Sequence, residues 1–193
     1  MGLSKVRYLF SQLPRILKTW FGITDRRRWA VNVTEKPSWD ERNKIIASYI
    51  PPNSSILDLG AGAQTLKKYA ASLSLYVPCD IVKSSPDCLV CDFNEGLYPP
   101  LDRTYDITVC SGVLEYLRDP FTFLLTMRGY SKSFILSYQP ATGTSEDKLD
   151  RLTHGFVNNL LREELEGLLR QSGYRFECVA KWASQLIYRM DRA

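Results

Sequence analysis

The sequence predicts an α/β fold in which helices cover both faces of a mostly parallel β-sheet. Three observations lead to this prediction. Short apolar or β-branched segments alternate with helical patterns from residue 55 onward, which is typical of parallel sheets. A glycine-rich turn follows the first of these segments. Residues 173–190 then break the alternation with two strand patterns joined by a tight reversal, so at least one terminal strand should run antiparallel to the rest.

Each element is predicted from a local pattern. Strands are expected at 55–59, 75–80, 87–92, 105–110 and 133–138, and helices at 64–72, 120–129 and 160–171. A further helix is expected from Trp39 to Tyr49, because proline-containing pairs flank it on both sides. Residues 4–21 carry apolar side chains close to one helical face, and Pro14 should start or break a helix there. The link at 82–86 is too short for the usual crossover helix.

Length and composition narrow the class of protein. A chain of 193 residues with 45% hydrophobic and 24% charged residues suits one sizeable globular domain. No stretch approaches the roughly 20 apolar residues of a membrane span. Arg7, Arg15 and Lys18 interrupt the N-terminal segment, which therefore lacks the apolar core of a secretion signal. We expect a cytoplasmic protein.

The cysteines do not predict a metal site. Cys88 and Cys91 have CxxC spacing, but no second ligand pair lies nearby and His154 is the single histidine. The five cysteines are therefore expected to be reduced and structural.

The positive charge is concentrated near the N-terminus. Residues 1–36 contain eight lysines and arginines against two acids, a net charge of +6, whereas the remainder has 17 against 19, a net charge of −2. We therefore divide the chain into a basic amphipathic arm or lid, residues 1–40, and a ligand-binding domain, residues 41–193. The arm could pack on the cleft as a lid, or dock on a membrane surface or a partner.

The segment "ILDLGAG" contains the main functional signal. A strand that ends in glycines lets a ligand approach the backbone where no Cβ intrudes, as in nucleotide-binding folds. Asp80 ends the next strand, 18 residues after Gly62, where an acid can accept ribose hydroxyls. A P-loop is excluded because Gly-Lys-Ser/Thr is absent, and the third glycine of GxGxxG is missing. Asp58, just before the glycines, suits a ligand with a positively charged amino group, although both acids could instead cap helices or turns.

"ILDLGAG", "CDIV", "CDFNE" and "YDITVCSGVLEYLRDP" together resemble, in order and spacing, the motifs of class I S-adenosylmethionine-dependent methyltransferases. The similarity covers roughly residues 45–190. It implies a three-layer Rossmann-like methyltransferase fold with a mostly parallel sheet and an antiparallel C-terminal strand. It also implies S-adenosylmethionine as the cofactor. The position often held by a third glycine is Gln64, which would narrow the loop slightly.

The resemblance assigns roles to residues in each motif. The implied cofactor-binding residues are Asp58, Gly60, Ala61 and Gly62 at the methionine end, Asp80 and Ile81 at the ribose, Asp92 and Phe93 at the adenine, and Ser111 and Gly112 near the methyl group. Glu115 and Tyr116 match an acid–histidine pair, with tyrosine in place of histidine. A hydroxyl acceptor needs a base near neutral pH, and the candidates are His154, Tyr116 and Glu115. Glu115 could instead cap or brace its helix, Tyr116 could serve packing, and His154 could be an incidental histidine in a loop.

The substrate class is predicted by elimination and by a second resemblance. The (Asp/Asn)-Pro-Pro-(Tyr/Phe) loop of nucleic-acid amino-methylating enzymes is absent, so a nucleic-acid acceptor is not expected. "HGFVNNLLREELEGLLRQSGY" and "SYQP" resemble small bacterial methyltransferases of sugar or polysaccharide pathways. We expect a small-molecule or sugar acceptor methylated on oxygen or nitrogen. The alternative is a protein that binds S-adenosylmethionine without turnover, as a regulator or partner subunit.

Overall fold

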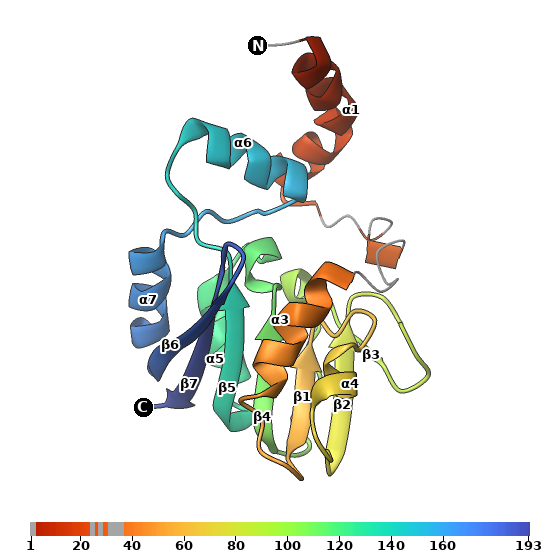
Figure 1. Ribbon diagram of the computed structural model, residues 1–193, viewed down its shortest axis with the longest axis vertical. Coiled ribbons are helices and arrows are strands. Elements are labelled where there is room, and N and C mark those ends of the chain that lie inside the picture. Colours follow the sequence, from red (N-terminus) through yellow and green to blue (C-terminus); the bar gives the residue numbers. More distant parts are fainter. Residues whose placement is uncertain (1–2, 24–25, 27–28, 31–36) are drawn as a thin grey trace.

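The protein is a three-layer α/β structure in the computed structural model, which describes residues 3–23, 26, 29–30 and 37–193 (Figure 1). One seven-stranded sheet forms the middle layer. Its strands are β1 (Ser55–Leu59), β2 (Leu75–Asp80), β3 (Leu89–Val90), β4 (Tyr105–Ser111), β5 (Ser131–Tyr138), β6 (Tyr174–Trp182) and β7 (Gln185–Arg192). The helices are α1 (Leu3–Trp20), α3 (Pro37–Ala47), α4 (Leu66–Tyr69), α5 (Pro120–Met127), α6 (Ser145–His154) and α7 (Arg162–Gln171).

The order of the strands creates a binding crevice. In space they follow the order β3-β2-β1-β4-β5-β7-β6, and β7 pairs antiparallel with both β5 and β6 while the other pairs are parallel. The chain turns outward from β1 in one direction and returns to β4 on the other side. Such a switch point leaves a crevice at the carboxyl ends of the central strands, where ligands bind in open α/β sheets.

Each face of the sheet has its own hydrophobic core. Ile46 of α3 and Leu66 of α4 pack on one face together with Ile56, Val109 and Ile135 from the strands. The other face is covered by α5 and α7, through side chains that include Phe123, Leu124, Met127, Leu165 and Leu169. Alternate residues of a strand point to opposite faces, so central strands that are covered on both sides are apolar throughout. This explains why residues pointing to both faces are buried over most of β1 and β4.

The predicted fold class is confirmed, and several element boundaries are corrected. β3 spans two residues rather than 87–92, because its ladder with β2 includes only Leu89 and Val90. The helix expected at 64–72 contains only Leu66–Tyr69, because Gln64 and Ser72 have positive φ values of 58° and 45°. Pro14 lies inside α1 and neither starts nor ends that helix. As expected, no helix joins β2 to β3.

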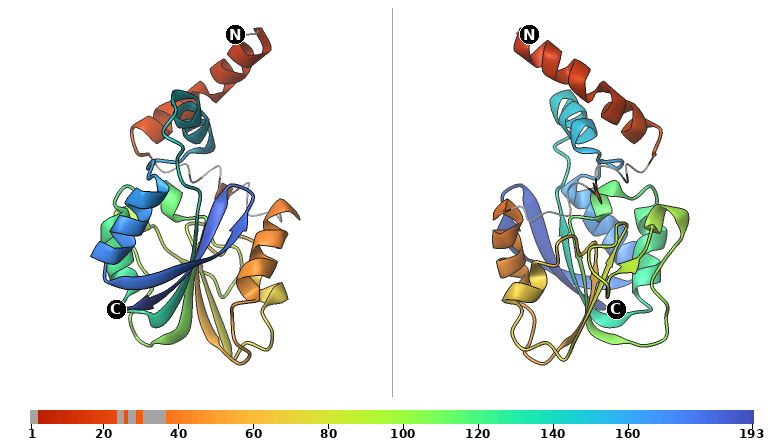
Figure 2. Two further views of the ribbon diagram at one scale, coloured as in Figure 1. Left: turned by 60° about the vertical axis from the view of Figure 1, so that its left-hand side comes forward. Right: turned by 90° about the vertical axis from the view of Figure 1, so that its right-hand side faces the viewer.

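Two helices lie beyond the carboxyl edge of the sheet. α6 follows β5, and α1 packs against it, away from the sheet (Figure 2). The polar segment of α6 was not predicted to be helical. It is stabilised at both ends, because Thr144 accepts a hydrogen bond from the Asp147 amide and Gly155 adopts a left-handed conformation with φ of 78°. Within the described parts of the chain, no helix has both the length and the apolarity to cross a bilayer.

Candidate functional site

A cavity of about 500 Å³ opens at the carboxyl ends of β1, β2 and β4. Its volume is within the usual range for small-molecule sites. All thirteen residues singled out in the sequence line it: Asp58, Gly60, Ala61, Gly62, Asp80, Ile81, Asp92, Phe93, Ser111, Gly112, Glu115, Tyr116 and His154. Residues separated by almost one hundred positions therefore meet in one place, although lining a cavity does not by itself assign their roles.

The glycine bend after β1 is closed on one side and open on the other. Gly60 and Gly62 have positive φ values of 78° and 51°, which side chains rarely adopt. A Cβ on Gly60 would lie 2.1 Å from Cγ2 of Val113, so no side chain fits there. A Cβ on Gly62 would meet nothing within 4 Å, because this side of the bend faces the cavity. A ligand can thus approach the backbone at Gly62.

Asp58 is a buried acid next to the bend. It is 3% exposed, and its Oδ2 accepts a hydrogen bond of 2.5 Å from the Tyr76 hydroxyl. Burial raises the pKa of Asp58 from 3.8 to about 6, against the opposing effects of the Tyr76 hydrogen bond and the Arg42 charge. A cationic group brought into the cavity would stabilise the ionised form.

Asp80 ties the second strand to the same bend. Its Oδ2 accepts the Gly62 amide at 2.8 Å, and its Oδ1 accepts the Val82 amide at 3.2 Å. Burial nevertheless raises the pKa of Asp80, and these backbone donors only partly offset the increase. Each carboxylate oxygen has a second lone pair, so Asp80 can still accept hydroxyl donors from a ligand.

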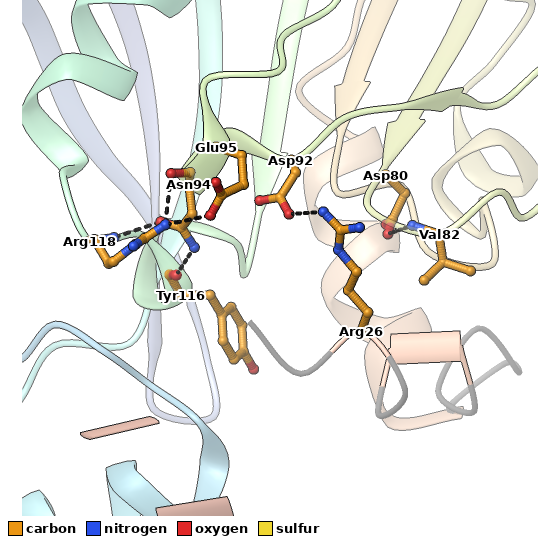
Figure 3. Close-up of polar contacts among 8 residues, drawn as sticks. All are labelled: Arg26, Asp80, Val82, Asp92, Asn94, Glu95, Tyr116 and Arg118. Carbon is orange, nitrogen blue, oxygen red and sulfur yellow. Dashed lines mark hydrogen bonds and ion pairs between the residues drawn. The ribbon is translucent and has the colours of Figure 1, made fainter. Parts of the chain in front are cut away.

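Asp92 lies beside the cavity and pairs with the N-terminal part of the chain. Figure 3 shows Arg26 reaching toward Asp92, and Arg26 Nη2 lies 2.7 Å from Asp92 Oδ2. The carboxylate is buried, whereas the Arg26 side chain is 63% exposed. The neighbouring Phe93 ring packs against Tyr98 and Phe123, at centroid distances of 5.5 and 5.1 Å.

The loops that follow β3 and β4 brace each other. Asn94 Nδ2 donates to the backbone oxygen of Tyr116 at 2.9 Å (Figure 3). Arg118 Nη2 donates to the Asn94 carbonyl at 2.8 Å and to Glu95 Oε1 at 2.9 Å. These contacts hold the segment that contains Glu115 and Tyr116 against the segment that contains Asp92.

Glu115 is a buried carboxylate with one oxygen in use. It is fully buried, and its Oε1 accepts the Gln139 amide at 2.8 Å. Its Oε2 has no hydrogen-bond partner in the described structure, although the residue lines the cavity. Burial raises the pKa of Glu115, while the Gln139 amide and the charges of Arg42 and Arg151 act in the opposite direction. A buried acceptor without a partner is costly, and a ligand donor would relieve the cost.

Aromatic rings connect Tyr116 to His154. Tyr116 contacts Trp29 and Phe156 edge-on, at centroid distances of 4.7 and 5.2 Å, and the His154 ring lies 5.9 Å from Phe156. His154 is the last residue of α6, not part of a loop. Its Nδ1 lies 2.9 Å from the Asp150 backbone oxygen and 3.4 Å from the Asp150 carboxylate. Asp150 therefore orients the imidazole at the rim of the cavity.

Sequence analysis missed a buried arginine in the cavity wall. Arg42 of α3 is 6% exposed and lies between the rings of Trp39 and Trp182, at 5.6 and 5.7 Å from their centroids. Its Nη1 donates to Gln185 Oε1 at 3.1 Å, and burial lowers its pKa. Gly112 is required beside it, because a Cβ there would lie 2.5 Å from Arg42 Nη1. No local signal marks Arg42 as buried, because Trp182 and Gln185, which cover it together with Trp39, come from the β6–β7 hairpin far along the chain.

The described residues contain no cluster of three or more His, Cys, Asp and Glu side chains that could hold a metal ion. All five cysteines are free thiols, and four of them are buried.

No protein-family model matches the chain. No curated protein matches it either.

Several solved structures share the fold. The plantazolicin methyltransferase BamL, solved with a desmethyl-plantazolicin analogue and S-adenosylhomocysteine (SAH), is 14% identical with a TM-score of 0.62, over 98% of this chain and 99% of BamL. Magnesium protoporphyrin IX methyltransferase from Synechocystis PCC 6803, solved with SAH, is 15% identical with a TM-score of 0.61, over 92% and 99% of the two chains. CalO1, a methyltransferase of calicheamicin biosynthesis solved with SAH, is 18% identical with a TM-score of 0.60 over 80% of this chain.

This chain spans 54% of the length of CalO1 and 62% of that of PhzM, a pyocyanin biosynthetic protein. At these identities the comparisons establish the fold. The chain has the Rossmann-like fold of class I methyltransferases, as the sequence motifs predict.

Proposed function

We propose that this protein transfers a methyl group from S-adenosylmethionine to a small-molecule acceptor in the cavity. The observation that carries the proposal is the pair of acids at the ends of β1 and β2. Asp58 precedes the glycine bend, which is open to the cavity at Gly62, and Asp80 accepts a hydrogen bond from the Gly62 amide. The arrangement fits a nucleoside with a cationic amino-acid tail, because one acid can take the ammonium and the other the ribose hydroxyls.

The remaining donor contacts follow from the order of the motifs around the cavity. In this proposal Gly60, Ala61 and Gly62 hold the methionine end with Asp58, Ile81 supports the ribose with Asp80, Asp92 and Phe93 meet the adenine, and Ser111 and Gly112 lie near the methyl group. Three of the similar structures, BamL, the protoporphyrin methyltransferase and CalO1, were solved with SAH, which supports this donor.

The reaction requires alignment more than acid–base chemistry. S-adenosylmethionine supplies a methyl group activated on a sulfonium. The protein holds the acceptor atom in line with that group and excludes water, and such positioning lowers the barrier by several kcal/mol. The loop that contains Glu115 and Tyr116 forms part of the cavity wall and is braced by Asn94 and Arg118.

For a hydroxyl acceptor we assign His154 as the general base. The Asp150 carboxylate lies 3.4 Å from His154 Nδ1, which orients the ring. Glu115 presents the unpartnered Oε2 as a hydrogen-bond acceptor for the ligand. Tyr116 forms part of the aromatic wall between Trp29 and Phe156.

A ring-shaped polar acceptor, such as a sugar, fits the lining of the cavity. Trp29, Trp39, Tyr116, Phe156 and Trp182 all line it, together with the charged and amide groups of the wall. Aromatic faces bind rings through apolar contact, while the polar groups set their orientation. An amine acceptor on such a ring would not need the base.

The first 40 residues act as a lid in this proposal. Arg15, Thr19, Gly22 and Ile23 line the cavity, and Arg26 pairs with Asp92. Deleting residues 1–25 should therefore weaken donor binding by at least tenfold. A deletion variant with the same donor affinity as the full chain would remove the lid from the mechanism.

Two measurements test the proposal in sequence. Isothermal titration calorimetry of the full chain should show binding of S-adenosylmethionine and of SAH. SAH release is then followed with a panel of sugars and small metabolites as acceptors. No binding of either nucleoside would refute the proposal, whereas binding without product from any acceptor would favour a regulatory or partner subunit that retains the donor site.

Two variants separate the roles at the rim. His154→Ala should lower kcat with a hydroxyl acceptor by roughly 10²–10⁴-fold at unchanged donor affinity. Glu115→Gln should mainly raise KM, because it removes a binding contact. Unchanged turnover in His154→Ala would exclude that residue as the base.

A further inference from the structure

The C-terminal half of α1 and the residue that follows it, Phe21, present large apolar side chains to solvent. Leu13, Leu17, Trp20 and Phe21 are 45%, 49%, 73% and 70% exposed, and we call these four residues the outer stripe. In all views α1 extends away from the sheet, with its N-terminal end furthest from the body (Figures 1 and 2). A contiguous apolar patch of this kind marks an interaction surface more often than a chance exposure.

The orientation of α1 is the reverse of that of an ordinary surface helix. Arg15 and Thr19 of α1 line the cavity, and the neighbouring Ile16 is half-buried. Arg15 Nη1 donates to the Thr153 carbonyl at 3.2 Å, which fixes the helix in this rotation. A helix normally turns its apolar face toward the protein. Here polar side chains of the helix, Arg15 and Thr19, meet the protein, while the apolar side chains of the outer stripe remain exposed to solvent.

The sequence around the stripe favours an anionic, apolar target. The first 24 residues contain four lysines and arginines and no acid. An apolar stripe accompanied by basic residues is typical of helices that lie in the plane of a lipid interface.

We propose that α1 docks through the outer stripe on an anionic lipid bilayer, lying in the interface without crossing it. The like charge of two such arms opposes a second copy of this chain as the partner. Arg15 is engaged with Thr153 on the inner side, so anionic headgroups attract the other lysines and arginines of the segment, while Trp20 and Phe21 enter the boundary between headgroups and acyl chains. The cytoplasmic leaflet is anionic, which agrees with the cytoplasmic location expected from the sequence.

Docking would place the cavity next to the bilayer. Arg15 and Thr19, on the inner side of the same helix, line the cavity, whereas Leu17 and Trp20 do not. The lipid-facing and cavity-facing surfaces are therefore opposite sides of one helix. Lipid binding is separate from methyl transfer, so it can be measured without a donor or an acceptor.

Vesicle co-sedimentation of the full chain tests the docking. Two kinds of vesicle are used, one of phosphatidylcholine alone and one of equal parts phosphatidylcholine and phosphatidylserine. The protein should bind the mixed vesicles at least tenfold more strongly, and added salt should weaken the binding. The double variant Leu17→Glu/Trp20→Glu should lose at least tenfold in binding. The control Leu101→Glu/Leu125→Glu, which adds the same charges at exposed apolar positions outside the cavity, should bind like the wild type.

Unchanged thermal unfolding of the Leu17→Glu/Trp20→Glu variant shows that any loss of binding comes from the surface and not from misfolding. The proposal is overturned if the wild type does not sediment with the mixed vesicles, or binds both kinds equally. It is also overturned if sedimentation survives the double substitution. A dimer in light scattering that the same variant dissolves would assign the stripe to a second copy instead.

Discussion

Replacing Asp58 with asparagine tests the electrostatics of the glycine bend. Burial raises the pKa of Asp58 from 3.8 to about 6 in the folded protein. Protonated Asp58 stabilises the folded state. This stabilisation is fully present at a pH below the ordinary pKa of 3.8 and is lost as the pH rises through about 6. The wild type therefore loses folding stability between about pH 4 and about pH 6 because Asp58 ionises. The Asp58→Asn variant has no ionisable group at residue 58, so it does not share this loss.

The size of the effect follows from the pKa shift. Because the pKa is raised by about two units, ionisation of Asp58 costs the folded protein about 3 kcal/mol of stability between acidic and neutral pH. About half of this stability is already lost at about pH 5. The free energy of unfolding of Asp58→Asn, relative to the wild type, should therefore rise by about 1–2 kcal/mol between about pH 5 and about pH 7.5. Fitting an amide beside Tyr76 has a cost that does not depend on pH, so it cancels from this comparison. For a chain of this length the difference is about 3–5 °C in Tm.

Circular dichroism melts over a series of pH values measure how the Tm of each variant changes with pH. Calorimetry with SAH measures the affinity for the nucleoside. The variant should lose roughly tenfold to hundredfold in affinity, because a charge-assisted hydrogen bond to the ammonium is removed. Asp106→Asn is the matched control. Asp106 is exposed on β4, and bonds from the Ser55 amide and hydroxyl lower its pKa, so this variant should lose a little stability at neutral pH and keep its affinity.

A difference in Tm between Asp58→Asn and the wild type that stays constant with pH would refute the electrostatic reasoning. Unchanged affinity for SAH would refute the contact between Asp58 and the ammonium, even if the stability effect were found.

Three further predictions concern the same cavity. Affinity for S-adenosylmethionine should fall as the pH drops below about 6, because Asp58 becomes protonated, whereas calorimetry with 5′-methylthioadenosine, which lacks the ammonium, should show no such loss. Gly60→Ala should cost about 2–4 kcal/mol in urea unfolding, since its Cβ would overlap Val113, and Gly62→Ala only about 1 kcal/mol, since its Cβ meets open space. Arg26→Gln should weaken donor binding about twofold to fivefold, because the exposed ion pair with Asp92 contributes up to about 1 kcal/mol to holding the lid on the cavity. Tighter donor binding by this variant would instead mean that Arg26 competes with the donor for Asp92.

The donor side of the cavity could be predicted because its residues are adjacent in the sequence. Asp58, Gly60 and Gly62 lie within five positions, and Asp80 ends the next strand. The carboxyl ends of neighbouring parallel strands always meet at one edge of a sheet, so a motif at the end of each strand is placed by topology alone. The positions were therefore predictable without knowledge of any side-chain contact, although their roles as ligands still need the experiments above.

The opposite wall could not be predicted, because it depends on contacts between distant segments. Arg42 is buried by Trp39, three positions away, but also by Trp182 and Gln185 of the β6–β7 hairpin. A single arginine in a helix usually faces solvent, so nothing local indicated that this one does not. The same applies to α6, whose polar sequence lacks a clear apolar stripe and whose ends are set by the Thr144 cap and Gly155.

Several ionisable side chains line the cavity, and burial disfavours their charged forms in the protein without a ligand. Asp58, Asp80 and Glu115 are all acids whose pKa burial raises, and burial lowers the pKa of Arg42 beside them. Asp58 and Glu115 are buried and Asp80 is half-buried, and the nearby charges of Arg42 and, at Glu115, of Arg151 do not outweigh the effect of burial on these acids. A ligand with a sulfonium and an ammonium supplies positive charge within reach of two of the acids, while a neutral nucleoside does not. Under the proposed function, a cationic donor should therefore bind more tightly than a neutral nucleoside, because each carboxylate that ionises in this wall is stabilised by the charge that the donor brings.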